Sequence, residues 1–144
     1  MTAALTLALS SPGVVVRQET HSNGHVDLTI EVPHCVPARR ILAEAKIYNG
    51  PKYHIDGLQQ LLRRYITGRD RRGLVIVYFK ISGIAGAVQR VRVEMDTNLP
   101  LDQQGPTRPH VLKWSFLSVH KHSSGEHLEI GHIGCNLYVD PILK

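Results

Sequence analysis

One short run limits the fold of this chain more than any other feature. Leu74–Phe79 (LVIVYF) is almost wholly apolar, which is typical of a central strand buried on both faces. The residues before it, His54–Asp70, carry apolar side chains at helical spacing: Ile55, Leu58, Leu61, Leu62, Tyr65 and Ile66. A helix that leads into a buried strand indicates a crossover connection. The sequence therefore predicts a sheet with at least one parallel strand pair.

Three further strands are expected before that helix. Val14–Gln18 is a short β-branched run, and His25–Val32 and Arg39–Tyr48 alternate apolar and polar residues. The Asn-Gly pair at 23–24 indicates a turn between the first two strands. The prolines in the segment 33–38 (PHCVPA) exclude it from a sheet, so it connects the second strand to the third.

The last 60 or so residues are expected to add a helix and a hairpin. The run Ser82–Glu94 suits a helix better than a strand, a polar loop follows over Asp96–Pro109, and two strands near Val111–Val119 and Leu128–Val139 close the domain. The whole pattern predicts one α/β domain over residues 1–144. Its core is a mixed β-sheet flanked by helices, with a C-terminal β-hairpin.

Composition agrees with a domain of this kind. A chain of 144 residues is suited to one compact unit, and no apolar stretch approaches the roughly 18–20 residues needed to span a bilayer. The apolar start of the chain has no preceding Lys or Arg, so Ala3–Leu9 is read as a helix rather than a signal peptide. Cys35 and Cys135 form no pair motif, which predicts reduced thiols in a cytoplasmic protein.

The net charge bears on the partner. Lys and Arg number 17 against 12 Asp and Glu, a formal charge of +5. A positive field attracts polyanions such as nucleic acid. Many soluble domains are modestly basic, however, so charge alone leaves the partner open.

A register argument brings two acids and a lysine together. If the hairpin around segment 33–38 is symmetric, Asp27 lies opposite Glu44, and Glu31 lies opposite Arg40. Residues that are directly opposed on antiparallel strands share a face, with Cβ atoms about 4.5–5.5 Å apart. Lys46 lies two residues after Glu44 and projects from that same face.

Two neighbouring carboxylates repel each other unless a positive charge lies between them. Mg²⁺ or Mn²⁺ fits this position, since such hard cations take carboxylate ligands and keep water for chemistry. Metal-bound water can attack a phosphodiester, and a nearby ammonium can stabilise the developing charge. The alternative is that Asp27, Glu44 and Lys46 are simply the solvated face of a sheet.

The ordered motifs add to this pattern. An acid before a turn, an acid in a strand, Glu-x-Lys in the next strand, a Gln-bearing helix and an apolar strand follow one another in three segments: QETHSNGHVDLTI (18–30), RILAEAKIYNGPKYHIDGLQQLLRRYITGRD (40–70) and GLVIVYF (73–79). This arrangement resembles the core of the PD-(D/E)XK nucleases, which are related to restriction endonucleases and DNA-repair nucleases. The resemblance covers a little under half of the chain.

The resemblance implies roles for several residues. Asp27 matches the first metal-binding acid, although Val26 precedes it where the motif's name has proline. Glu44 matches the second metal ligand and Lys46 the catalytic lysine. Glu19 matches an additional upstream acid that some members use.

A glutamine in the following helix also lines the site in some members, often with a tyrosine one turn later. Gln60 aligns best, but Tyr65 follows it by five residues rather than four. A helical wheel places Gln59 at the edge of the apolar stripe and Gln60 nearly opposite its centre.

Two other clusters have more than one interpretation. Lys52, Arg63, Arg64 and Arg69, with Arg71 and Arg72, are expected around this helix as a phosphate-contacting surface, although a solvated helix face has the same composition. A second group of side chains could hold zinc: His120, His122, His127, His132 and Cys135. No further cysteine pair completes a tetrahedral set, so surface or edge-strand histidines are the simpler account.

Together these features predict a restriction-endonuclease-like α/β domain that hydrolyses phosphodiester bonds with Mg²⁺ or Mn²⁺, with DNA favoured over RNA. The size suggests either a homodimer or a module of a larger protein. The alternative is a non-catalytic nucleic-acid-binding or assembly module that keeps the nuclease fold.

Overall fold

The computed structural model describes residues 14–20, 26–36, 39–65 and 71–143, with the backbone alone at residues 19, 20, 26, 27, 64, 65 and 143. The helix expected at Ala3–Leu9 lies outside these residues. The elements, in chain order, are β1 (Val15–Thr20), β2 (Val26–Val32), β3 (Arg39–Ile47), α2 (Gly50–Gln60), the π-helix η1 (Leu61–Tyr65), β4 (Arg72–Phe79), α3 (Ile84–Asn98), β5 (Arg108–Pro109), β6 (Phe116–Lys121), β7 (His127–Asn136) and the short 3₁₀ helix η2 (Pro141–Leu143).

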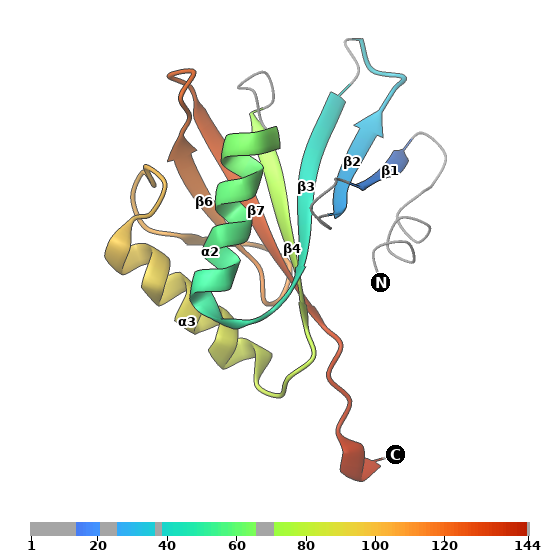
Figure 1. Cartoon of the computed structure of the whole chain (residues 1–144), viewed down its shortest axis with the longest axis vertical. Coiled ribbons are helices and arrows are strands. Elements are labelled where there is room, and N and C mark those ends of the chain that lie inside the picture. Colours follow the sequence, from blue (N-terminus) through green and yellow to red (C-terminus); the bar gives the residue numbers. More distant parts are fainter. Residues whose placement is uncertain (1–13, 21–25, 37–38, 66–70, 144) are drawn as a thin grey trace.

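The strands form one mixed sheet in the order β1-β2-β3-β4-β7-β6-β5. β4 pairs in parallel with both β3 and β7, and every other neighbouring pair is antiparallel. Helices α2 and α3 lie on the same face of this sheet (Figure 1). The predicted α/β class, with a mixed sheet and a parallel crossover, is confirmed.

β4 is the central strand, as its apolar run predicts. Val75, Val77 and Phe79 enter the larger core cluster, which lies beneath α2 and α3. The alternate residues Ile76 and Tyr78 enter a second cluster on the opposite face. Both faces of β4 are therefore buried, which explains why its sequence does not alternate between apolar and polar residues.

The predicted elements differ from the structure mainly at their ends. α2 begins at Gly50 rather than at His54 because Asn49 is its N-cap and Pro51 lies in its first turn. α3 is a helix, as expected, but it runs on to Asn98, where Leu99 adopts a left-handed conformation.

The C-terminal hairpin is part of the central sheet rather than an addition to its edge. β6 and β7 pair antiparallel, as predicted, but β6 begins at Phe116 instead of Val111. β7 pairs with the whole length of β4, from the Arg72–Glu129 pair to the Phe79–Asn136 pair. The hairpin therefore supplies one of the two strands that pair with β4.

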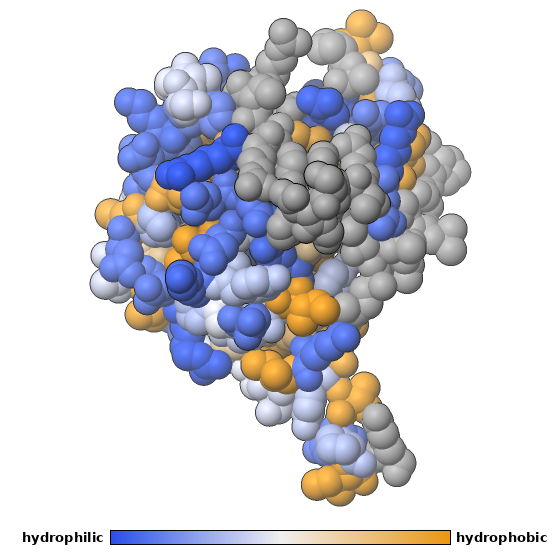
Figure 2. Space-filling model, in the orientation of Figure 1, coloured by the Kyte–Doolittle hydropathy of each residue, from blue (hydrophilic) through white to orange (hydrophobic). Residues whose placement is uncertain are grey.

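Residues after β7 leave the sheet and extend away from it (Figure 1). Val139 and Ile142 are exposed there, and Figure 2 shows apolar surface on this extension. None of the helices in the described part of the chain is long and apolar enough to cross a membrane.

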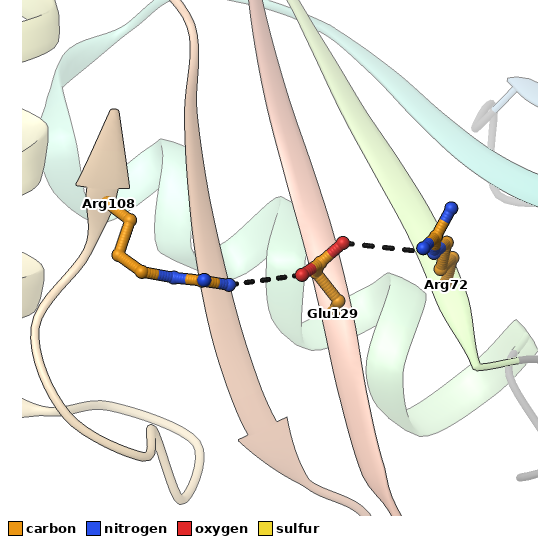
Figure 3. Close-up of polar contacts among 3 residues, drawn as sticks. All are labelled: Arg72, Arg108 and Glu129. Carbon is orange, nitrogen blue, oxygen red and sulfur yellow. Dashed lines mark hydrogen bonds and ion pairs between the residues drawn. The ribbon is translucent and has the colours of Figure 1, made fainter. Parts of the chain in front are cut away.

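Arg72 is not beside α2, so its assignment to that basic surface is wrong. Glu129 on β7 lies between Arg72 and Arg108, with N–O distances of 3.8 Å and 3.0 Å (Figure 3). Its neighbours Leu128 and Ile130 face the helix-covered core, so Glu129 points to the opposite face. These side chains are partly exposed, and such pairs contribute about 0–1 kcal/mol each.

Replacement of Leu128 by Ala tests this account of the core. Leu128 is 0% exposed, so Leu128→Ala should lower the free energy of unfolding by about 2–5 kcal/mol in a urea titration. Leu112, which is 53% exposed, is the matched control, and Leu112→Ala should change that free energy by no more than about 0.5 kcal/mol. Equal losses for the two variants would contradict the assigned burial.

Candidate active site

Three acidic residues lie in register across the first three strands. Glu19 of β1 is opposite Asp27 of β2, and Asp27 is opposite Glu44 of β3. The Asp27–Glu44 and Glu31–Arg40 pairs are those that a symmetric connection predicts. The structure describes the backbone alone at Glu19 and Asp27, so it is their strand positions that are established.

Glu44 lies inside the protein. Its neighbour Leu42 packs against the core cluster beneath the helices, while Ala43 belongs to the cluster on the other face. Glu44 therefore points toward α2 and η1, and it is only 1% exposed. The alternative interpretation of a solvated sheet face is wrong for Glu44. Keeping an ionised carboxylate at such a depth requires positive charge or hydrogen-bond donors around it.

Lys46 shares the buried face with Glu44 and is 7% exposed. Its Nζ lies 4.3 Å from the centroid of the Tyr53 ring, on the first turns of α2. It also lies close enough to His54 to lower the pKa of that imidazole. A carboxylate and an ammonium, two residues apart on β3, are thus both enclosed by the crossover helix.

Gln60 is the last residue of α2, and its Oε1 is buried. The helical wheel placed this residue away from the apolar stripe, so that prediction is wrong. The π-helix η1 follows directly, and a π-helix repeats its contacts at five residues rather than four. Residue 65 therefore lies one helical turn after Gln60, as a residue four positions later would in an α-helix.

The structure accounts for part of the predicted basic surface. Lys52 of α2 and Arg63 of η1 are exposed. Arg64 lies beside Arg63 in η1 with its backbone alone described, and Arg69 lies outside the described residues. Of the predicted group, Lys52 and Arg63 are therefore shown as exposed cations, one on α2 and one on η1.

A buried chain of polar side chains was missed from the sequence. His54 Nε2 lies 2.8 Å from His132 Nδ1, and His132 Nε2 lies 2.8 Å from the Oγ of Ser118. That hydroxyl lies 2.8 Å from His120 Nε2, and His120 Nδ1 donates to the Leu101 carbonyl at 3.0 Å. The alternation of Ser118 with His120 in β6 is the only sequence signal for it.

These hydrogen bonds also show where two of the C-terminal histidines lie and what they contact. His120 and His132 point into the core toward Ser118, so the expectation of surface or edge-strand histidines is wrong for these two residues. Among residues with described side chains, no group of three His, Cys, Asp or Glu could hold a metal ion. Cys35 and Cys135 are free thiols, as predicted.

Burial keeps these histidines neutral. Desolvation, together with the charge of Lys46, lowers the pKa of His54 to about 4. Desolvation, with a smaller effect from the other two imidazoles, lowers the pKa of His132 well below its usual value. Desolvation also lowers the pKa of His120, against the opposing effect of its carbonyl hydrogen bonds. A neutral ring can donate at one nitrogen and accept at the other, as His120 and His132 do in this network.

The donor set at the acids is suited to a hard divalent cation. Glu44 supplies a buried carboxylate, and strand pairing places Asp27 directly opposite and Glu19 one strand further. Mg²⁺ and Mn²⁺ prefer oxygen donors of this kind, whereas zinc favours nitrogen and sulfur. The residues present therefore fit a magnesium or manganese ion.

Comparison of the chain with known protein families, curated proteins and solved structures gave no match.

The buried histidines predict a loss of stability in mild acid. An unfolded chain takes up protons at His54 near pH 6.5, whereas the folded chain does so only near pH 4. The free energy of unfolding should therefore fall as pH is lowered from about 7 to 4, by roughly 3 kcal/mol from this residue. Urea titrations at several pH values measure the slope.

His54→Gln should flatten that slope. The matched control is His127→Gln, because His127 is exposed at the start of β7, and it should keep the wild-type slope. An unchanged pH dependence in His54→Gln would show that His54 is not the titrating group.

Proposed function

We propose that this protein is a divalent-metal-dependent nuclease that hydrolyses phosphodiester bonds, with DNA favoured over RNA. The observation that carries the proposal is the enclosure of Glu44 and Lys46, two residues apart on β3, with Glu44 directly across from Asp27. Buried opposite charges of this kind are expensive for a fold to maintain, and ionisable groups in such environments cluster at functional sites.

The order of elements supports a restriction-endonuclease-like fold. Antiparallel β1, β2 and β3 are followed by the crossover helix α2 and by β4, which pairs in parallel with β3. The resemblance to PD-(D/E)XK nucleases implies this order, with the acids and the lysine at the positions that Asp27, Glu44 and Lys46 occupy. The π-turn after Gln60 agrees with the glutamine and tyrosine positions that the same resemblance implies.

Each residue then has a distinct part in the reaction. Asp27 and Glu44 would hold Mg²⁺ or Mn²⁺, which supplies an acidified water and offsets phosphate charge. Lys46 holds an attacking water and stabilises the developing negative charge with its ammonium. Glu19 adds a carboxylate one strand further from Glu44, and Gln60 provides an amide at the end of α2.

The substrate class follows from charge. The formal charge of +5 attracts a polyanion, and the exposed Lys52 and Arg63 lie on α2 and η1, which cover the site. Contacts of this type position a nucleic-acid backbone without reading its sequence.

Cleavage assays on plasmid and single-stranded DNA test the proposal directly. Wild-type protein should cleave with Mg²⁺ or Mn²⁺ and lose activity with EDTA. Asp27→Asn, Glu44→Gln and Lys46→Ala should each lower the rate by at least about 100-fold, because each removes a group that acts in the transition state.

Exposed residues of the C-terminal hairpin provide matched controls for those variants. Glu126→Gln and Lys121→Ala change the same chemical groups at exposed positions, so they should cleave like the wild type. Metal binding by calorimetry adds a second measurement, since Glu44→Gln should weaken it while Lys46→Ala should not. Tight DNA binding without cleavage in any metal would instead favour the non-catalytic binding module.

Salt dependence tests the basic surface. Lys52→Ala and Arg63→Ala should each weaken DNA binding and lower the slope of log affinity against log salt by about 1. Fluorescence anisotropy without divalent metal measures both quantities. Arg108→Ala is the control, because Arg108 is paired with Glu129 on the opposite face, and it should leave the slope unchanged.

A further inference from the structure

The side chain of Lys46 is confined by two residues of α2 that lie one helical turn apart. Gly57 faces the lysine stem so closely that an added Cβ would lie 2.7 Å from Lys46 Cδ and 2.8 Å from Cε. A side chain at position 57 would therefore displace the lysine stem, and the bare backbone of Gly57 leaves room for it. Tyr53 lies four residues earlier on the same helical face.

The Tyr53 ring meets the charged end of the same side chain. Lys46 Nζ lies 4.3 Å from the ring centroid, well within the range of a cation–π contact. Lys46 is 7% exposed and Tyr53 is 39% exposed, so the ring lies at the boundary between the enclosed ammonium and solvent. A desolvated ammonium gains more from a π-face than an exposed one does.

The next residue of α2, His54, does not repel the Lys46 ammonium. His54 follows Tyr53 directly, and burial keeps it uncharged at neutral pH, with a pKa of about 4. Its Nε2 is engaged by His132 at 2.8 Å. His54 therefore adds no second cation near the ammonium, which lies over the Tyr53 ring.

We propose that Tyr53 and Gly57 are positioning residues that hold Lys46 in its working orientation, Gly57 by seating the stem and Tyr53 by holding the ammonium. This inference rests on the proposed nuclease function, in which Lys46 acts on the water and the phosphate. A lysine side chain is a flexible four-carbon stem and loses much conformational entropy when it is fixed. Because Tyr53 and Gly57 hold the side chain before the reaction begins, this entropy is not lost in the chemical step. Positioning matters there, since a displacement of about 1 Å in a reacting group can lower the rate about 100-fold.

Kinetic measurements on two Tyr53 variants separate a positioning role from a role in folding. Tyr53→Phe keeps the ring and should retain kcat within about twofold. Tyr53→Leu removes it and should lower kcat by roughly 10–100-fold with KM little changed, because the DNA contacts remain. A general loss of structure would instead change KM and thermal stability in both variants.

Gly57→Ala tests the seat of the stem. The added methyl group collides with Lys46, so kcat should fall about as far as in Tyr53→Leu. Gly86→Ala in α3 is the matched control, since its Cβ would meet only Arg90 Nη1 at 3.5 Å, and its kcat should equal that of the wild type. Wild-type kcat in both Tyr53→Leu and Gly57→Ala would overturn the inference.

A measurement that does not depend on activity keeps the two proposals apart. In NMR spectra of lysine-labelled protein, the ring current of Tyr53 should shift the Lys46 Hε signals upfield in wild type and Tyr53→Phe, but not in Tyr53→Leu. Absence of that shift in wild type overturns the positioning role even if the protein cleaves DNA. A normal shift with no cleavage under any condition overturns the nuclease function, and the role of Tyr53 in catalysis with it.

Discussion

The parallel pairing of β4 with β3 is the constraint on which the rest of the structure depends. A parallel partner requires the chain to cross back over the sheet between the two strands, and α2 with η1 makes that crossing. The helix then covers the face of β3 that carries Glu44 and Lys46, and encloses both. The same crossing brings His54 against β7. One topological requirement therefore produces both the enclosed acid–lysine pair and the buried histidine chain.

Buried polar groups beneath α2 are accommodated in two different ways. The histidines are held neutral by desolvation and are linked by hydrogen bonds through Ser118 to the Leu101 carbonyl, so they add rigidity without charge. Lys46 has the face of the Tyr53 ring against its ammonium. This division puts charged groups at the β3 side of the covered face and an uncharged network at the β6–β7 side. An active site benefits from such an arrangement because a rigid, uncharged support does not screen the working charges.

Much of the fold could be predicted because its signals are local. The apolar run of β4, the alternation of β2 and the prolines of segment 33–38 identify strands and a connection, and hairpin symmetry places Asp27 opposite Glu44. Predictions that assumed regular geometry were less accurate. The wheel for Gln60 assumed an uninterrupted α-helix, whereas a π-turn follows directly. The hairpin was expected as an addition, because nothing local to β7 indicates which strand it will pair with.

The sequence by itself predicted the register of β2 against β3 and hence the pairing of Asp27 with Glu44, because residue spacing and a short connection suffice to set a hairpin. The pairing of Glu19 with Asp27 came from the structure. Only the tertiary structure decided that Glu44 and Lys46 are buried, that Tyr53 and Gly57 receive the lysine, and that Arg72 pairs with Glu129 on the opposite face. Those outcomes depend on which segments pack together across long sequence separations. Alternation tells which residues share a face, but the covering helix determines which face is removed from water.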